Sequence, residues 1–188
     1  MNTRRIALAL TAATLAPALL LSTPSFAATG TATAPVCGAK AKVGVTDDDN
    51  AVTILRLLRD RACGKSVIRE ANAALSGTPQ DRVTFLTTGL ARARDEDNAV
   101  AILRLLAAKP GKAVTREANK ALSGTAADRA AFLATGLRLA QAEDDRVTVL
   151  RILARPGISD ALRAAANKAL DGTPEDLRYF VTVGQYQV

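Results

Sequence analysis

Residues 74–89 read ALSGTPQDRVTFLTTG, and two further copies of this stretch follow along the chain. The second copy is ALSGTAADRAAFLATG at 121–136, shifted by 47 positions, and the third is ALDGTPEDLRYFVTVG at 169–184, shifted by a further 48. In each copy Gly-Thr-x-x-Asp follows Ala-Leu, and a Phe lies ten residues after the Leu. A repeat of this period predicts an all-α protein, a solenoid-like array of α-helical units that cover each other's apolar faces.

The centre of each copy combines the signals of a helix end and a helix start. The glycine predicts a left-handed residue just past the last turn of one helix. The Thr and the Asp three residues later predict a capping box, and Pro79 and Pro174 suit the first position of the new helix. These positions are Gly77, Gly124 and Gly172; Thr78, Thr125 and Thr173; and Asp81, Asp128 and Asp176.

The pattern predicts three units of about 47 residues with about three helices each. In each unit a first helix, an Ala-rich helix and the capped helix that carries the Phe follow one another. For the second and third units, a first helix that begins at Leu90 and Leu137 is favoured over one that begins at the acidic cluster. Gly89 and Gly136 are then expected to reverse the chain direction. The expected ranges are 46–89, 90–136 and 137–184 for the units, 46–188 for the repeat domain, and 28–45 for a mobile or capping lead-in.

The core is expected to use one apolar stripe per helix. On the first helix Val52, Leu55 and Leu58 recur at helical spacing, with Ile54 and Leu57 widening the stripe. The Phe of each copy is expected to anchor the core of its unit, because burying a Phe contributes about 1.5–3 kcal/mol. These residues are Phe85, Phe132 and Phe180.

Residues 1–27 have the pattern of a secretory signal peptide. Arg4 and Arg5 precede an apolar run, and small residues at Ser25 and Ala27 predict cleavage after Ala27. The apolar run is short for a membrane anchor, which needs about 20 residues, so no membrane span is expected after cleavage. The general and the twin-arginine export routes both stay open, and we expect a secreted, extracellular or cell-wall-associated protein.

The two cysteines, Cys37 and Cys63, are expected to form a disulfide, because an exported protein with an even cysteine count favours pairing. The bond would tie the lead-in to the loop after the first helix. The chain has no Cys-x-x-Cys motif, which argues against a redox-active pair.

Charge and composition narrow the function. The formal net charge of +7 falls to +5 when Arg4 and Arg5 are removed, a balance that favours anionic surfaces such as cell-wall polymers. No Lys/Arg cluster and few aromatic residues speak against nucleic-acid binding. The lack of histidine removes the commonest general base and the usual zinc ligand sets. We therefore predict no catalytic residue, no metal, no cofactor and no enzyme activity.

Each unit carries an acidic cluster, at 47–49, 95–97 and 143–145. One interpretation is a calcium site or a carboxylate pair for glycoside cleavage, although the spacing of an EF-hand is missing. The other is a group of acids at a helix start, which offsets the helix dipole. Recurrence in three units favours the structural interpretation.

Two polar positions per unit are candidates for partner binding. The asparagines of the Ala-rich helix are expected to bond the backbone of an adjacent loop. The arginines inside the apolar runs are expected either to pair with an acid or to line one open face as a ladder for an anionic ligand. The residues are Asn72, Asn119 and Asn167, and Arg56, Arg104 and Arg151.

The recurring Ala-Leu and Phe, with Gly-Thr-x-x-Asp between them, resemble the short ALF repeats of secreted actinobacterial proteins. The matching residues are Ala74, Leu75 and Phe85; Ala121, Leu122 and Phe132; and Ala169, Leu170 and Phe180. The resemblance implies an exported α-helical repeat protein without an established activity, and it supplies no catalytic residue.

The expected function is therefore a secreted, non-enzymatic binding or interaction module at the cell surface. Its partner would be an unknown protein or an anionic cell-wall component. A carboxylate-dependent hydrolase of cell-wall polymers and a passive structural domain remain the alternatives.

Overall fold

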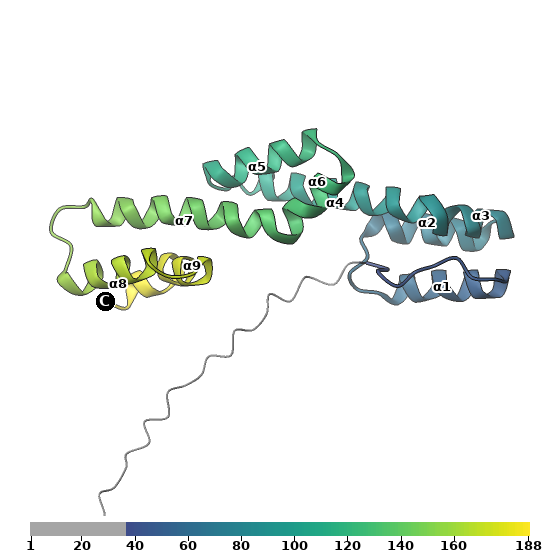
Figure 1. Ribbon diagram of the computed structural model, residues 1–188, viewed down its shortest axis with the longest axis horizontal. Helices are drawn as coiled ribbons and strands as arrows, with labels where there is room; N and C mark the ends of the chain where they lie inside the picture. The colour runs from purple at the N-terminus through teal and green to yellow at the C-terminus, as the bar shows by residue number, and fades with distance from the viewer. Residues whose placement is uncertain (1–36) are drawn as a thin grey trace, which may run out of the picture. The chain divides into compact units, whose positions relative to one another are not determined.

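The structure, a computed structural model, describes residues 37–188, and this part of the chain contains helices and no strand (Figure 1). The predicted signal peptide at 1–27 and the beginning of the lead-in lie outside the described residues. Within residues 37–188, no helix combines the length and the apolar character needed to cross a membrane.

The described helices form three consecutive units of three helices. In the first unit α1 contacts α2 and α3, in the second α4 contacts α5 and α6, and in the third α7 contacts α8 and α9. The prediction of an all-α repeat array is confirmed. The bounds are α1 Asp47–Arg59, α2 Lys65–Ser76, α3 Pro79–Thr84; α4 Leu90–Ala107, α5 Lys112–Ser123, α6 Ala126–Ala131; and α7 Leu137–Leu153, α8 Asp160–Leu170, α9 Pro174–Thr182.

Successive units share a continuous helix. A π-helical turn, η1 (Phe85–Gly89), joins α3 to α4, and a second, η2 (Phe132–Gly136), joins α6 to α7 (Figure 1). The α-helices α4 and α7 begin at Leu90 and Leu137, as predicted. The expected chain reversal is wrong, because Gly89 is helical with φ −61° and ψ −42°. The glycine instead leaves room for a ring: a Cβ on Gly89 would lie 3.2 Å from Cδ2 of Phe85.

The third unit lacks such a turn. Helix α9 ends at Thr182, Val183 leaves the helical region with φ −132°, and a 3-10 turn follows at Gly184–Tyr186. Within residues 37–188, the π turn thus occurs at the two places where the last helix of one unit continues into the first helix of the next.

The capping boxes are confirmed in all three copies. In the first copy the Thr78 hydroxyl accepts from the Asp81 amide, and the Asp81 carboxylate accepts from the Thr78 amide at 2.7 Å. The same box forms at Thr125 and Thr173. Thr46 and Asp49 form a fourth box at the start of α1.

The predicted left-handed conformation of the preceding glycines is wrong. Gly77 has φ −92° and ψ −160°, an extended conformation, and Gly124 and Gly172 also lack a positive φ. The glycine is needed for space, because a Cβ on Gly77 would lie 2.5 Å from Oδ2 of the capping Asp81. A β-carbon and the carboxylate of the box compete for the same volume.

The buried residues form three clusters, and the first two extend into the first helix of the next unit through Leu90, Ala93 and Ala140. The Phe anchors are confirmed, since Phe85, Phe132 and Phe180 are all buried. Alanines of the short helices, such as Ala71 and Ala118, are fully buried and allow close approach of the neighbouring helices. The clusters include Ile54, Leu57 and Val67; Ile102, Val114 and Ala140; and Val149, Ile152 and Leu177.

The expected stripe on the first helix is wrong in part. Ile54 and Leu57 are buried in α1, and Leu58 packs beside them. Val52 and Leu55 are 43% and 50% exposed and lie outside the buried cluster. Helix α1 therefore has a second apolar face, which points away from its own unit.

The predicted disulfide between Cys37 and Cys63 is confirmed, with a Cα–Cα distance of 4.6 Å. Both cysteines belong to the buried cluster of the first unit. Asp60 supports this end of the unit, because its carboxylate accepts from the amides of Gly38 (3.0 Å) and Ala62 (2.9 Å). The disulfide joins the segment before α1 to the loop between α1 and α2.

Candidate functional site

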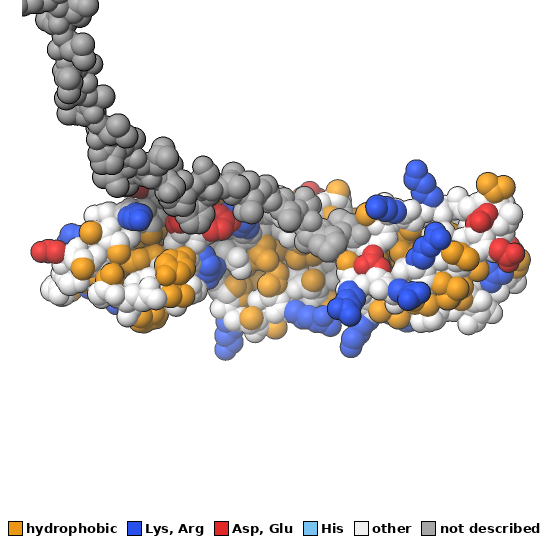
Figure 2. Space-filling model, turned by 90° about the horizontal axis from the view of Figure 1, so that it is seen from below, with side chains coloured by type: hydrophobic (Ala, Val, Ile, Leu, Met, Phe, Trp, Pro, Cys, Tyr) orange, Lys and Arg blue, Asp and Glu red, His pale blue; other side chains and the backbone are white. Residues whose placement is uncertain are grey.

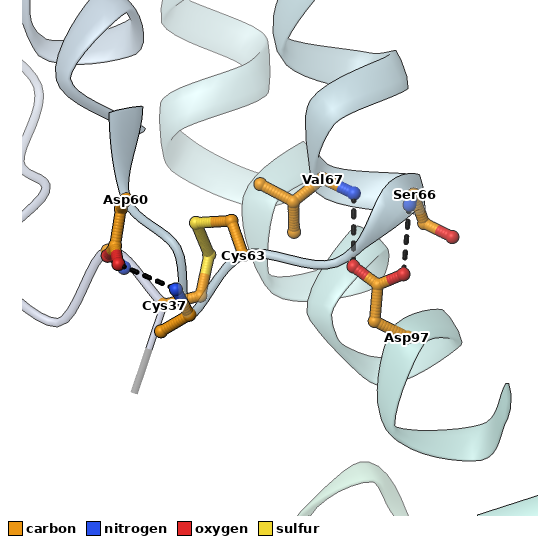
Figure 3. Close-up of a disulfide and its surroundings, with 8 residues drawn as sticks. Cys37, Asp60, Cys63, Ser66, Val67 and Asp97 are labelled. Carbon is orange, nitrogen blue, oxygen red and sulfur yellow. Dashed lines mark hydrogen bonds between the residues drawn. A yellow bond between two sulfur atoms is a disulfide. The ribbon is translucent and has the colours of Figure 1, made fainter. Parts of the chain in front are cut away.

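The acidic cluster of each later unit caps a helix of the unit before it. Asp97 in α4 accepts from the amides of Ser66 (2.8 Å) and Val67 (3.2 Å), which begin α2 (Figure 3). Asp144 in α7 accepts from Ala113 (2.9 Å) and Val114 (3.0 Å), at the start of α5. A carboxylate on an N-terminus satisfies unpaired amides and the helix dipole together. These acids therefore hold neighbouring units to each other.

Glycine makes this cap possible. Gly64 and Gly111 are the N-cap residues of α2 and α5, and neither has a side chain to cap its own helix. A Cβ on Gly111 would collide with the carboxylate of Asp144, and a Cβ on Gly64 with that of Asp97. The N-cap residue in one unit thus has no side chain, which leaves room for the carboxylate from the next unit.

In the first two units, the first acid of the cluster forms a bidentate ion pair with an arginine of the third helix of the same unit. Arg129 donates from Nε and Nη2 to the two carboxylate oxygens of Asp95 at 2.6 and 2.7 Å. Its Nη1 also donates to the backbone oxygens of Leu122 and Gly124, which end α5. The hydrogen bond from Arg129 lowers the pKa of Asp95. Arg82 and Asp47 form the same pair in the first unit.

The glutamates of the second and third clusters pair across units on the surface. Arg69 of α2 binds Glu96 of α4 at 3.0 Å, and Arg116 of α5 binds Glu143 of α7 at 2.9 Å. All four side chains are more than half exposed, so each pair contributes little to stability.

These contacts correct the sequence interpretation of the clusters. Residues 47–49 do lie at a helix start. The second and third clusters lie inside α4 and α7, several residues from either N-terminus, so the dipole argument is wrong there. The physical reason is the π turn, which lets one helix run on before the cluster begins.

The third unit has moved its ion pair. At the positions equivalent to Arg129 and Asp95, it carries Leu177, which is buried, and Ala142, which packs against the same cluster. Arg178, one residue after Leu177, lies 3.0 Å from Asp145, three residues after Ala142. Asp145 is only 5% exposed, and burial raises its pKa while Arg178 opposes the rise.

Most acidic side chains have a hydrogen-bond or ion-pair partner within the described residues. Of the 18 Asp and Glu residues, all within residues 37–188, fifteen form a cap, a backbone hydrogen bond or an ion pair. Only Asp48, Asp160 and Asp171 have no such partner in this part of the chain.

The bases are used far less. Of the 23 Lys and Arg residues left after Arg4 and Arg5, six form ion pairs, and Nε and Nη2 of Arg94 are buried. The other sixteen are exposed and have no ion-pair partner within the described residues. The bases without an ion-pair partner therefore outnumber the acids without a partner by sixteen to three in residues 37–188.

The arginines predicted for partner binding belong to this exposed set. Arg56, Arg104 and Arg151 lie on α1, α4 and α7, and none pairs with an acid in residues 37–188. Arg56 lines a hollow with residues 38–41, whereas Arg104 and Arg151 line none of the described hollows. The structure thus gives each unit one such arginine and does not bring the three into one pocket.

The predicted asparagines are exposed on the short helices. Asn72 donates to the backbone oxygen of Ile68 in its own helix at 2.9 Å, so the expected bond to an adjacent loop is wrong at that position. The ties between units come instead from Asp97 and Asp144.

Sequence reasoning missed the exposed apolar neighbours of the arginines. The equivalent residues are Val52 and Leu55, Val100 and Leu103, and Val147 and Leu150, all at least 37% exposed. With Arg56, Arg104 and Arg151 they form what we term the Val-Leu-Arg patch of each unit. Figure 2 shows exposed hydrophobic side chains beside Lys and Arg side chains on one face of the described part.

One group within residues 37–188 has the composition of a small metal site. Sulfur atoms of Cys37 and Cys63 and a carboxylate oxygen of Asp60 lie within 4.8 Å of one another. The two sulfurs are bonded to each other, and Asp60 already accepts two backbone amides. A metal would have to compete with the disulfide, so these residues do not fit one.

A comparison with known families agrees with the repeat pattern. The profile of the ALF family, described as short repeats of unknown function, matches residues 52–93, 100–140 and 146–188. A comparison with curated proteins finds no match. Because the three matched segments cover most of the chain and each overlaps one of its three helical units, this protein belongs to the ALF repeat family.

Proposed function

We propose that this protein is an exported, non-catalytic binding module that holds an anionic partner at the cell surface. The observation that carries the proposal is the unequal use of charge within residues 37–188. Fifteen of 18 acids serve the fold, while sixteen exposed bases have no ion-pair partner there. A surface of this kind attracts anionic partners through its long-range field and binds them less well as salt increases.

The state of the acids argues against the hydrolase alternative. A glycosidase needs one carboxyl with a raised pKa to act as an acid next to an ionised partner. The cluster acids for which a shift is resolved mostly go the other way, because hydrogen bonds from Arg82 and Arg129 lower the pKa of Asp47 and Asp95. Asp97 and Asp144 spend both carboxylate oxygens on backbone amides.

Export is supported by the disulfide and by the sequence of the first 27 residues. A disulfide that belongs to a buried cluster is typical of proteins folded outside the reducing cytoplasm. The basic start, apolar run and small residues before Ala27 are typical of a secretory signal.

The proposal is tested with poly-L-glutamate as a defined polyanion. We expect the chain from residue 28 onward, with its disulfide formed, to bind at 50 mM NaCl and to dissociate by 300 mM. The triple variant Arg56→Gln, Arg104→Gln, Arg151→Gln should lower the affinity. Binding that does not change with salt, or release of sugars from purified cell walls, would overturn the proposal.

The matched control removes the same charge elsewhere. Arg61, Lys109 and Arg155 are exposed, lie near the loop after the first helix of each unit and have no ion-pair partner in residues 37–188. Replacing all three by Gln should weaken polyglutamate binding less than the first triple variant does. An equal loss in both variants would assign binding to net charge alone.

A further inference from the structure

The Val-Leu-Arg patch occupies a face of the first helix that its own unit does not use. In α4, Ile102 is buried while Val100 and Leu103 are exposed. In α7, Val149 and Ile152 are buried while Val147 and Leu150 are exposed. The three leucines are 50%, 54% and 51% exposed, although each sits beside the core of its unit. The same uncovered face therefore recurs three times.

The spacing of the patch makes it a continuous ridge. Val, Leu and Arg lie at positions i, i+3 and i+4 of the helix, so their side chains share one surface. An apolar ridge of this kind packs against a second helix with the same spacing. The arginine at its edge then selects the charge of that helix.

The charge of the Val-Leu-Arg patch indicates which kind of partner it binds. No acid of residues 37–188 pairs with Arg56, Arg104 or Arg151, and the described surface carries sixteen exposed bases without an ion-pair partner. A second copy of this chain would bring arginine against arginine, which is unfavourable. A polyanion without aliphatic groups would satisfy the arginines and leave Val and Leu in water.

We infer that the Val-Leu-Arg patches dock acidic amphipathic helices of a partner protein, one helix per unit, with leucine-type side chains on Val and Leu and carboxylates on Arg. The inference rests on the proposed function and deepens it, because it replaces an anionic partner of any kind by one of stated chemistry. Three equivalent patches permit a partner with repeated helices to bind with an avidity that one patch lacks.

The test uses a synthetic helical peptide with leucines at i, i+3 and i+4 spacing and glutamates elsewhere on its surface. A second peptide replaces each glutamate by glutamine, and poly-L-glutamate supplies charge without leucine. We expect the disulfide-bonded protein to bind the acidic peptide about tenfold more tightly than either comparison ligand. Equal affinity for the acidic peptide and polyglutamate would overturn the inference and leave the proposed function standing.

The decisive variant removes the apolar part of the patch and keeps its charge. Leu55→Ser, Leu103→Ser and Leu150→Ser together should weaken binding of the acidic peptide about tenfold and leave polyglutamate binding unchanged. The matched control replaces Ile68, Leu139 and Val183, which are also exposed and lie outside the patches, by Ser. Circular dichroism should show the helix content of the parent in both variants, because these side chains lie outside the cores.

Three outcomes overturn the inference. The first is a leucine variant that binds the acidic peptide as tightly as the parent. The second is an equal loss in the matched control, which would assign binding to general surface hydrophobicity. The third is leucine-dependent binding of anionic phospholipid vesicles without binding of the peptide, which would make the patch a membrane-surface contact.

Discussion

The N-terminus of the second helix is capped differently at the junctions between units and in the last unit. At the junctions, α2 and α5 begin with a glycine and receive a carboxylate from the next unit. In the third unit, α8 begins after Ser159, whose hydroxyl accepts from the Leu162 amide at 3.0 Å. A helix whose N-terminus faces an acid of the next unit has glycine as its N-cap residue, and α8, which has no such acid, is capped by the side chain of its own N-cap residue.

The ion pairs differ in the same sense. Arg129 and Asp95 hold the third helix of the second unit to α4, whereas Leu177 and Ala142 replace both partners in the third unit. Exchange of both partners for apolar residues avoids the cost of one unpaired buried charge. The comparison teaches that this architecture tolerates either solution, provided that both members of a contact change together.

The first unit is closed by a covalent bond, and its removal should have the largest effect. We expect Cys37→Ala with Cys63→Ala to lower the free energy of unfolding by about 3 kcal/mol, because the bond closes a loop of 26 residues in the unfolded chain. Urea unfolding measures the change. Amide exchange should rise in α1 and α2 more than in α8 and α9.

A reduced parent protein serves as the control and should match the double variant. An equal rise of amide exchange in all three units would mean that the array unfolds as one cooperative block. The different caps and ion pairs of the units would then not give the units different local stabilities.

The need for glycine at the N-cap of a junction helix is tested by adding a β-carbon there. Gly111→Ala should lower the free energy of unfolding by about 2–3 kcal/mol, since the new Cβ displaces Asp144 and removes the cap of α5. Asp144→Ala removes the cap alone and should cost about 1–2 kcal/mol. Chemical unfolding of each variant gives the values.

The double variant separates collision from conformation. In the Asp144→Ala background, Gly111→Ala should have little further effect, because the collision partner is gone. Additive losses would contradict the proposed competition for space. Gly157→Ala in the third unit meets no neighbour within 4 Å but has φ +71°, so its cost of about 1 kcal/mol should not depend on Asp144.

Removal of the Arg129–Asp95 ion pair should have a smaller effect on stability, and a second substitution should restore part of the loss. Arg129→Leu alone should lower Tm by roughly 4–8 °C, the shift that accompanies about 2 kcal/mol in a domain of this size, because Asp95 loses its bidentate partner and two carbonyls lose a donor. Arg129→Leu with Asp95→Ala copies the pairing of Leu177 and Ala142 and should regain at least half of the loss. A double variant less stable than the single one would show that the two solutions are not exchangeable.

Local signals in the sequence predicted the fold well. The capping boxes and the buried Phe residues depend on neighbours within one turn or on a single side chain, so residues such as Thr78 and Phe85 identify them directly. The disulfide followed from cysteine count and compartment. The helix through Gly89 did not follow, because a glycine that admits a ring and a glycine that reverses the chain look alike in sequence.

The contacts between units were not predicted, since their partners are about 30 residues apart. The bond from Ser66 to Asp97 spans 31 positions, and no local pattern marks it. For the ion pair within a unit a usable signal existed in the copies themselves, because Arg129 and Asp95 are both replaced in the third copy, by Leu177 and Ala142. The exposed patch escaped because periodicity reveals apolar faces without showing which of two faces, Ile54 or Leu55, is buried.

The smallest predicted effect concerns pH and the buried acid of the third unit. The second unit carries Asn98 where the third carries Asp145, so Asp145→Asn makes the two alike. Burial raises the pKa of Asp145 above its value in the unfolded chain, near 3.9, against the opposing charge of Arg178. Its contribution to stability is therefore complete below the unfolded pKa and is lost as pH rises through the folded pKa.

Asparagine does not titrate, so the variant should gain on the parent as pH rises from 3.5 to 7. We expect equal Tm values at the acidic limit and a gain of about 2–4 °C at pH 7, the shift that accompanies about 1 kcal/mol in a domain of this size. Asp95→Asn is the matched opposite: Arg129 lowers the pKa of Asp95, so stability present above pH 4 is lost in that variant. If both variants shifted Tm in the same direction with pH, Arg178 would stabilise Asp145 as fully as Arg129 stabilises Asp95, and the third unit would have relocated its ion pair without any electrostatic cost.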